Sequence, residues 1–201
     1  YRRGDSRGVV NLLTWSEEFD NAAWAGSGSV VTLNATISPT GEATAAKVVK
    51  ASGVIASVET LARYAIASSD LFCTSIYVKS AGFNEVTLIA SGAPAASVRW
   101  LTFNLATKTV RGISPGIGSI ATDYIFQDVG GGWFRIGIAS GTGMTNNSFQ
   151  VRLPYTGDGT SGIYIWGAQH NLGPTALDYQ RNDANLGGVA TGDSTDLHWL
   201  E

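Results

Sequence analysis

Aromatic side chains alternate with basic and amide side chains along four segments of the sequence. In one of them, Phe134, Ile136 and Ile138 occupy every second position. Because successive side chains of a β-strand point to opposite faces, Trp133 and Arg135 then share the other face. The other three segments show the same alternation. The outward-facing side chains of the four segments are Tyr77, Lys79, Trp133, Arg135, Gln150, Arg152, Tyr164 and Trp166.

Such a surface has the chemistry that binds a sugar. A flat aromatic ring stacks on the apolar side of a pyranose, and guanidinium, ammonium and amide groups bond its hydroxyls. The sequence therefore predicts one carbohydrate-binding face, formed by Tyr77, Lys79, Trp133, Arg135, Gln150, Arg152 and Trp166. In the alternative interpretation, this face is covered by loops, by another subunit, or by the N-terminal arm through Arg2, Arg3 or Arg7.

Residues that would carry catalysis are sparse. His170 and His198 are the only histidines, and neither stands in a metal-binding spacing. Most carboxylates fall in predicted turns or at strand ends, and no spacing singles out a pair for glycoside hydrolysis. The sequence contains no nucleophile elbow and no phosphate-binding loop. We therefore predict a protein that is not an enzyme and has no catalytic residue.

The composition is typical of secreted and virion β-proteins. Charged residues make up only 14% of the 201 residues, and glycine occurs 25 times. The net charge of −3 gives no basic surface for a phosphate backbone, so we expect no nucleic-acid partner. No run approaches the roughly 18 apolar residues of a membrane helix, so we expect no membrane insertion and a soluble protein. The single cysteine, Cys73, excludes an internal disulfide and is predicted to be buried in a strand.

Short alternating segments follow one another along the chain, separated by clusters of Gly, Pro and Asn. This pattern predicts an all-β sandwich or barrel, because no long helical period is present. Residues 58–67 are ambiguous between a strand and a helical turn. The predicted strands cover residues 29–37, 43–54, 72–79, 85–90, 97–104, 109–113, 124–129, 133–139, 148–153 and 162–169.

The stretch from Asn11 to Trp24 is predicted as an opening strand and its corner. Leu12 and Leu13 would start the strand, and Phe19 would anchor the corner together with Trp24. The parity of the strands then places eight large side chains in one core. They are Phe19, Trp24, Phe134, Ile136, Phe149, Val151, Ile163 and Ile165.

Three regions of the chain differ in character. Residues 1–10 form an N-terminal arm, residues 11–179 the β-sandwich domain, and residues 180–201 a C-terminal tail rich in Asn, Asp and Gly. Such a tail seldom packs alone, so we expect it to cross to a neighbouring subunit or to lead to a further domain. Because both terminal regions are poor in apolar residues, we also expect self-association.

Five motifs, in order, resemble a domain family of bacteriophage tail fibres, tail spikes and other virion proteins. The family opens with Asn-Leu-Leu, Ser-Glu, Phe and Trp, which stand here between Asn11 and Trp24. Ala46 departs from the aspartate that the family usually has in its second motif. The other motifs are Ser38-Pro39-Thr40-Gly41 with Ala45-Ala46-Lys47-Val48, Ile76-Tyr77-Val78-Lys79-Ser80, Gly132-Trp133-Phe134-Arg135, and Tyr164-Ile165-Trp166-Gly167-Ala168-Gln169 with Pro174-Thr175 and Tyr179.

The resemblance, which extends to jelly-roll carbohydrate-binding modules, carries several expectations. It implies an antiparallel β-sandwich of jelly-roll type on a projection of the virion, an extracellular particle. It also implies a homo-oligomer, most readily a trimer, with a host-surface glycan and other virion proteins as partners. The alternative is a structural capsid-decoration or fibre-assembly module without a ligand.

The resemblance also makes calcium a candidate ion. The related sugar modules often hold calcium between the opening corner and the last strand, where Glu17, Asp20 and Asn21 would be the candidate ligands here. The last strand, around Trp166, lacks the aspartates that those modules commonly place there, so the prediction is that the protein has no cofactor and no metal, with calcium as the alternative.

Overall fold

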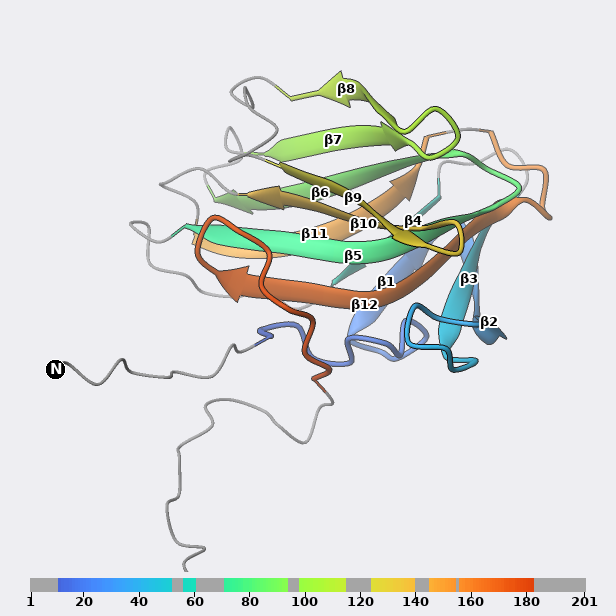
Figure 1. Ribbon diagram of the computed structural model, residues 1–201, viewed down its shortest axis with the longest axis horizontal. Helices are drawn as coiled ribbons and strands as arrows, with labels where there is room; N and C mark the ends of the chain where they lie inside the picture. Colours follow the sequence, from blue (N-terminus) through green and yellow to red (C-terminus); the bar gives the residue numbers. More distant parts are fainter. Residues whose placement is uncertain are drawn as a thin grey trace, which may run out of the picture.

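The computed structural model of this chain describes residues 11–51, 56–60, 71–93, 98–114, 124–139, 145–154 and 156–182. All regular elements in these ranges are β-strands, labelled β1 to β12 (Figure 1). No helix in them is long and apolar enough to cross a membrane. The predicted N-terminal arm with Arg2, Arg3 and Arg7 lies outside the described residues, and so does the tail beyond residue 182 with His198.

The strands form two six-stranded sheets that pack face to face (Figure 1). The first sheet has the order β1 (Trp24–Ser27), β4 (Ala56–Thr60), β11 (Thr145–Leu153), β6 (Glu85–Ala93), β7 (Arg99–Asn104) and β8 (Thr109–Ile113). The second sheet has the order β2 (Ser29–Thr36), β3 (Ala45–Lys50), β12 (Gly162–Leu172), β5 (Phe72–Ala81), β10 (Trp133–Ala139) and β9 (Tyr124–Gly130).

The connections make this an antiparallel jelly roll. Every pair of neighbouring strands is antiparallel. The chain crosses between the layers, so that β11 pairs with β4 and β6 while β12 pairs with β3 and β5. The predicted all-β sandwich of jelly-roll type is confirmed.

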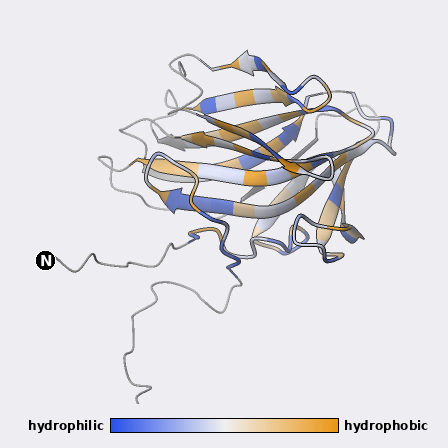
Figure 2. Ribbon diagram, in the orientation of Figure 1, coloured by the Kyte–Doolittle hydropathy of each residue, from blue (hydrophilic) through white to orange (hydrophobic). Residues whose placement is uncertain are grey.

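The core lies between the inner faces of the two sheets. Apolar and polar residues alternate along the strands (Figure 2), and the apolar ones point inward. Phe134, Ile136 and Ile138 of β10 meet Phe149 and Val151 of β11 in one buried cluster. All eight side chains that the sequence assigned to one core belong to this cluster, which confirms the parity of the strands.

The predicted strand boundaries hold for most of the chain, and two of them, 109–113 and 133–139, coincide with β8 and β10. The opening segment is the exception. Asn11 to Ala23 form no strand, and β1 begins only at Trp24. The predicted opening strand is therefore wrong, while the predicted corner is present.

Side-chain hydrogen bonds explain why the opening segment does not join a ladder. Asn11 Oδ1 accepts from the backbone N–H groups of Leu13 and His170, and Asn11 Nδ2 donates to Ala168 O. Three successive turns follow, closed by backbone bonds that end on Glu18, Asn21 and Trp24. Together with the backbone bond from Leu12 N–H to His170 O at 2.8 Å, these bonds satisfy polar groups of the segment without a strand ladder.

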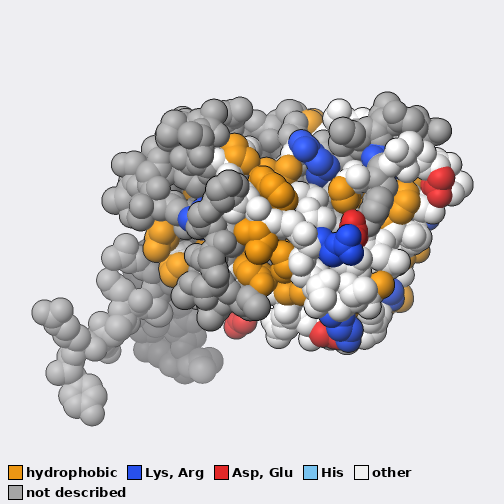
Figure 3. Space-filling view, turned by 90° about the horizontal axis from the view of Figure 1, so that it is seen from above, with side chains coloured by type: hydrophobic (Ala, Val, Ile, Leu, Met, Phe, Trp, Pro, Cys, Tyr) orange, Lys and Arg blue, Asp and Glu red, His pale blue; other side chains and the backbone are white. Residues whose placement is uncertain are grey.

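Charged side chains are few and scattered on the face seen in Figure 3. Neutral polar and hydrophobic side chains occupy most of the described surface between them. The described charges on this face form no large group of one sign (Figure 3).

Candidate carbohydrate-binding face

The seven residues predicted to form one face lie on two different sheets. The outer face of the second sheet carries five of them: Tyr77, Lys79, Trp133, Arg135 and Trp166. Gln150 and Arg152 of β11 lie on the outer face of the first sheet. The prediction of a common face is therefore wrong. Alternation separates inside from outside but does not say which sheet a strand joins, and the jelly roll sends β11 and β12 to opposite layers.

Residues of the chain itself cover the aromatic rings of the second sheet. Tyr179 packs there with its ring centroid 4.7 Å from that of Trp166. Trp133 and Trp166 keep only 3% and 5% of their surface exposed. Their indole N–H groups donate to Ile37 O and to Thr44 Oγ1, both at 3.1 Å. Neither face nor donor of these indoles is open to a sugar.

The basic groups of the second sheet are also engaged with the protein. Arg135 is buried, donates to Leu177 O and to Ser75 Oγ, and holds its guanidinium 5.3 Å from the ring centre of Tyr77. Lys79 is half-buried, with Nζ 6.0 Å from the ring centre of Trp133. For this sheet, the alternative interpretation of a face covered by other parts of the chain fits the structure.

Hydrogen bonds tie the covering C-terminal segment to the opening corner. The Tyr179 hydroxyl lies 2.8 Å from Ser16 Oγ and donates to Glu17 Oε1 at 2.9 Å. Burial raises the pKa of Tyr179, so the phenol stays protonated. Asn182 continues the contact, with its backbone N–H donating to Ser16 Oγ at 2.9 Å. These bonds hold the C-terminal segment, which includes Tyr179, against the outer face of the second sheet.

Two of the candidate calcium ligands make bonds within this corner. Glu17 accepts from Tyr179 and lies 3.8 Å from Arg181, and Asn21 Oδ1 accepts from the backbone N–H of Ala23. Asp20 is exposed. In the part of the chain that the structure describes, no three His, Cys, Asp or Glu side chains are grouped as a metal site.

Two buried side chains, His170 and Cys73, are of types that often act in catalysis, and burial shifts the pKa of both. His170 is 1% exposed, stacks on Phe72 and bonds Thr74 Oγ1 through Nδ1 at 2.8 Å. Burial lowers the pKa of His170 to about 3, which keeps the ring neutral at physiological pH. Burial raises the pKa of the Cys73 thiol to about 12, so no thiolate nucleophile forms.

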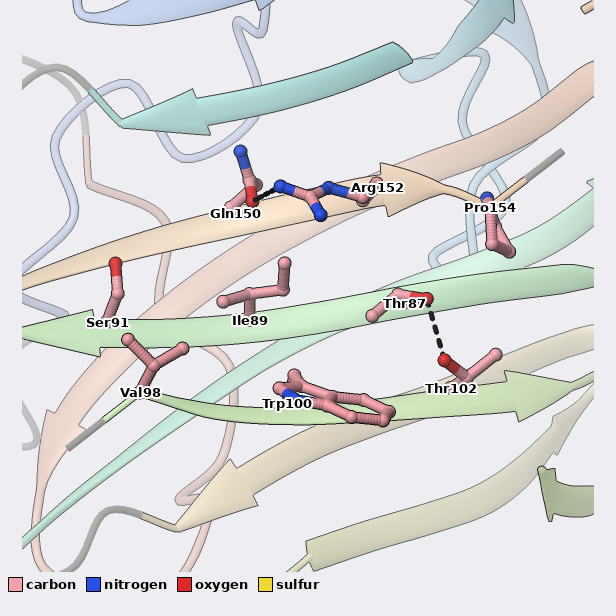
Figure 4. Close-up of a pocket in the computed structure, with 9 residues that line it drawn as sticks. All are labelled: Thr87, Ile89, Ser91, Val98, Trp100, Thr102, Gln150, Arg152 and Pro154. Carbon is pink, nitrogen blue, oxygen red and sulfur yellow. Dashed lines mark hydrogen bonds between the residues drawn. The ribbon is translucent and has the colours of Figure 1, made fainter. Parts of the chain in front are cut away.

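Described residues on the outer face of the first sheet form a groove. A groove of about 660 Å³ crosses β11, β6 and β7 (Figure 4), within the size range of small-molecule sites. Its residues are Thr87, Ile89, Ser91, Val98, Trp100, Thr102, Gln150, Arg152 and Pro154.

Trp100 supplies the aromatic surface of this groove. It points outward because its neighbour Leu101 is buried in the core, and its indole lies along β7 (Figure 4). Two bonds to Ser114 fix its backbone, from Ser114 N to Trp100 O at 2.9 Å and from Trp100 N to Ser114 Oγ at 3.1 Å. On the adjacent strand, a Cβ at Gly112 would lie 3.0 Å from the indole, so glycine leaves room for the ring to lie flat.

The register arranges the groove in two rows across the strands. Trp100 pairs with Ile89, and Ile89 pairs with Gln150. In the next row, Thr102 pairs with Thr87 and Thr87 with Arg152. Thr87 Oγ1 and Thr102 Oγ1 are 2.8 Å apart, and Arg152 Nη2 donates to Gln150 Oε1 at 3.1 Å (Figure 4). A row of indole, aliphatic and amide side chains thus lies beside a row of hydroxyl and guanidinium groups.

Gln150 and Arg152 were expected from the sequence, whereas Trp100 and the two threonines were missed. The signal for them was present. Residues 97–104 were predicted as a strand, and with Leu101 and Phe103 inside, the parity rule places Trp100 and Thr102 outside.

Comparison with known proteins gives no family assignment. The sequence matches no protein-family model and no curated protein. Similar solved structures include the CBM22-1 and GH10 modules of a Clostridium thermocellum xylanase in complex with xylohexaose, at 15% identity and a TM-score of 0.46 over 84% of this chain and 29% of that one. A CBM22-1 xylan-binding domain from Paenibacillus barcinonensis matches at 10% identity and a TM-score of 0.42, over 77% of this chain and 88% of that one.

Enzymes are also among the similar structures. A cyclase from Fischerella sp. TAU matches at 9% identity and a TM-score of 0.48, over 85% of this chain and all of that one. This chain spans less than a third of the xylanase chain. Similarity at this level does not identify a ligand or an activity.

Proposed function

We propose that this protein is a non-catalytic carbohydrate-binding domain whose site is the groove on the outer face of the first sheet. The observation that carries the proposal is the part-exposed indole of Trp100 at one side of a 660 Å³ groove whose other side carries Gln150 and Arg152. An indole face stacks on a sugar ring, and the hydroxyl, amide and guanidinium groups across the same groove bond hydroxyls of the sugar chain. The proposal keeps Gln150 and Arg152 of the predicted site and leaves out its five residues on the second sheet.

The binding is expected to be weak at a single site. Stacking on one ring contributes roughly 1 kcal/mol beyond the buried area, and the sugar loses hydration of its hydroxyls. The dissociation constant should therefore fall at about 0.1–10 mM. Several copies on one particle would raise the overall affinity without any new contact.

The sequence motifs support a location for this domain. Their resemblance to tail-fibre and tail-spike domains favours a projection of a bacteriophage virion, where a homotrimer would present three grooves to a host-surface glycan. Other virion proteins would then hold the domain through regions outside the groove. A structural decoration or assembly module without a ligand is the outcome if no glycan binds.

A glycan array followed by titration calorimetry tests the proposal. Trp100→Ala should weaken binding at least about tenfold while the melting temperature stays near that of the wild type. Tyr164→Ala is the matched control, because Tyr164 is a part-buried aromatic residue on the outer face of the second sheet. It should leave binding unchanged. If binding survives Trp100→Ala and is lost in Tyr164→Ala, the site lies on the second sheet and our assignment to the first sheet is wrong.

A further inference from the structure

The groove has one charged side chain, and that charge has no anionic partner in the described part of the chain. Among the nine described residues that line the groove, Arg152 is the only ionisable one. Its Nη2 donates to the neutral amide of Gln150 at 3.1 Å. Its Nε is shielded from solvent and has no hydrogen-bond partner among the described residues. Among the described residues, Nη2 thus bonds only a neutral amide, and the guanidinium has no carboxylate partner.

The other described arginines are bonded differently. Arg99 and Arg135 donate to the backbone carbonyls of Ala139 and Leu177. Arg111 pairs with Glu85 at 3.8 Å, and Arg181 pairs with Glu18 at 2.8 Å. Within the described ranges, only Arg152 has neither a carboxylate nor a backbone carbonyl as partner. For such a part-buried guanidinium, a ligand that supplies an anionic acceptor adds charge-assisted hydrogen bonds that the described protein groups do not make.

We propose that the glycan bound in this groove is acidic, and that Arg152 binds the carboxylate of a uronic-acid unit. A carboxylate presents two coplanar oxygens that match the fork of a guanidinium, and the charge-assisted bonds are roughly twice as strong as those to neutral hydroxyls. The Gln150 contact already orients the guanidinium, so little side-chain entropy remains to be lost on binding.

The rows of the groove give the arrangement of the sugar units. Trp100 and Gln150 stand at opposite ends of one row, two strand spacings or roughly 10 Å apart, and Arg152 lies at the same end as Gln150 in the next row. This span exceeds one sugar ring. The ring stacked on Trp100 and the ring that carries the carboxylate are therefore different units of one chain, which runs across the strands.

This inference rests on the proposed function, and matched polymers separate the two. The probes are polygalacturonate and glucuronoxylan, each with its carboxyl-reduced counterpart, which keeps the linkages and removes the charge. Affinity electrophoresis and calorimetry would be run on the wild type, Arg152→Gln and Arg111→Gln. Arg111 is the control, because it is an exposed arginine outside the groove that already pairs with Glu85.

The wild type should bind at least one acidic polymer about tenfold more tightly than its reduced form. Arg152→Gln should lower the affinity for the acidic polymer to that of the reduced one, and Arg111→Gln should have no effect. Equal binding of both forms, unchanged in Arg152→Gln, would overturn the acidic ligand and leave the carbohydrate site standing. An equal loss in Arg111→Gln would overturn it too, by showing general charge attraction.

Two further outcomes complete the test. Dextran sulfate is the third probe, and tighter binding of it than of either carboxylate polymer would overturn the assignment to a carboxylate. If neither the acidic nor the reduced polymers bind, and a neutral glycan array is also blank, the proposed function fails and the inference fails with it.

Discussion

Phe149 gives the sharpest stability test of the packing between the two sheets. It lies on the central strand β11, is fully buried, and meets Trp24 edge-on with ring centroids 5.9 Å apart. An aromatic side chain buries roughly 150–250 Å², which at about 25 cal/mol per Å² corresponds to roughly 4–6 kcal/mol for the whole side chain. Alanine retains part of this burial and leaves a cavity. We therefore expect Phe149→Ala to lower the free energy of unfolding by about 3–5 kcal/mol.

Urea denaturation followed by tryptophan fluorescence measures this change, with an unchanged m-value as the check on two-state unfolding. Phe149→Leu is the matched control, because it keeps most of the volume and should cost less than about 1.5 kcal/mol. A loss below about 1 kcal/mol for Phe149→Ala would refute the account, since a core truncation rarely costs so little. It would mean that Phe149 faces solvent and that Gln150 and Arg152 do not line a groove.

Three further predictions concern the corner, the buried histidine and assembly. Tyr179→Phe removes the hydroxyl bonded to Ser16 and Glu17 and should lower the free energy of unfolding by about 1–3 kcal/mol, as measured by urea denaturation. Because the pKa of Tyr179 is raised in the folded state, the stability of the wild type should begin to fall above about pH 10, and it should fall more than that of the variant. Burial lowers the pKa of His170 to about 3, so its NMR ring shifts should be those of a neutral imidazole down to about pH 4. The stability of the protein should fall as the pH drops below about 6.5, because the unfolded chain takes up the proton first. Titration of the ring near pH 6.5 would contradict its burial. Light scattering of the intact chain should give the mass of a homo-oligomer, with a trimer expected, and a clean monomer at high concentration would refute self-association.

The sequence predicts which side chains of each strand face the core, but it does not predict which strands pair with each other. Phe134, Ile136 and Ile138 alternate with Trp133 and Arg135, and this local pattern indicates which side chains enter the core between the two sheets. The pairing of β11 with β4 and β6 depends on contacts between residues far apart in the chain. No local pattern encodes such pairing, so the sheet to which Gln150 and Arg152 belong was not predictable.

The candidate site needed the structure for a second reason. Tyr179 and Leu177 lie on the second sheet only because the C-terminal segment turns back to Ser16 and Asn11. The sequence placed Trp133 and Trp166 on an outer face, and they are on one, but it could not show that the face is covered. Trp100, by contrast, could have been found by the parity rule.

An NMR titration tests the central claim most directly, because each indole N–H gives its own signal. The glycan to use is the oligosaccharide that the array identifies as the best ligand, added to the intact protein at millimolar concentration. We predict that the Trp100 indole N–H and the Gln150 side-chain amide shift with a single binding curve, while the buried indole N–H groups of Trp133 and Trp166 stay in place. Shifts of Trp133 and Trp166 with Trp100 unmoved would contradict the account.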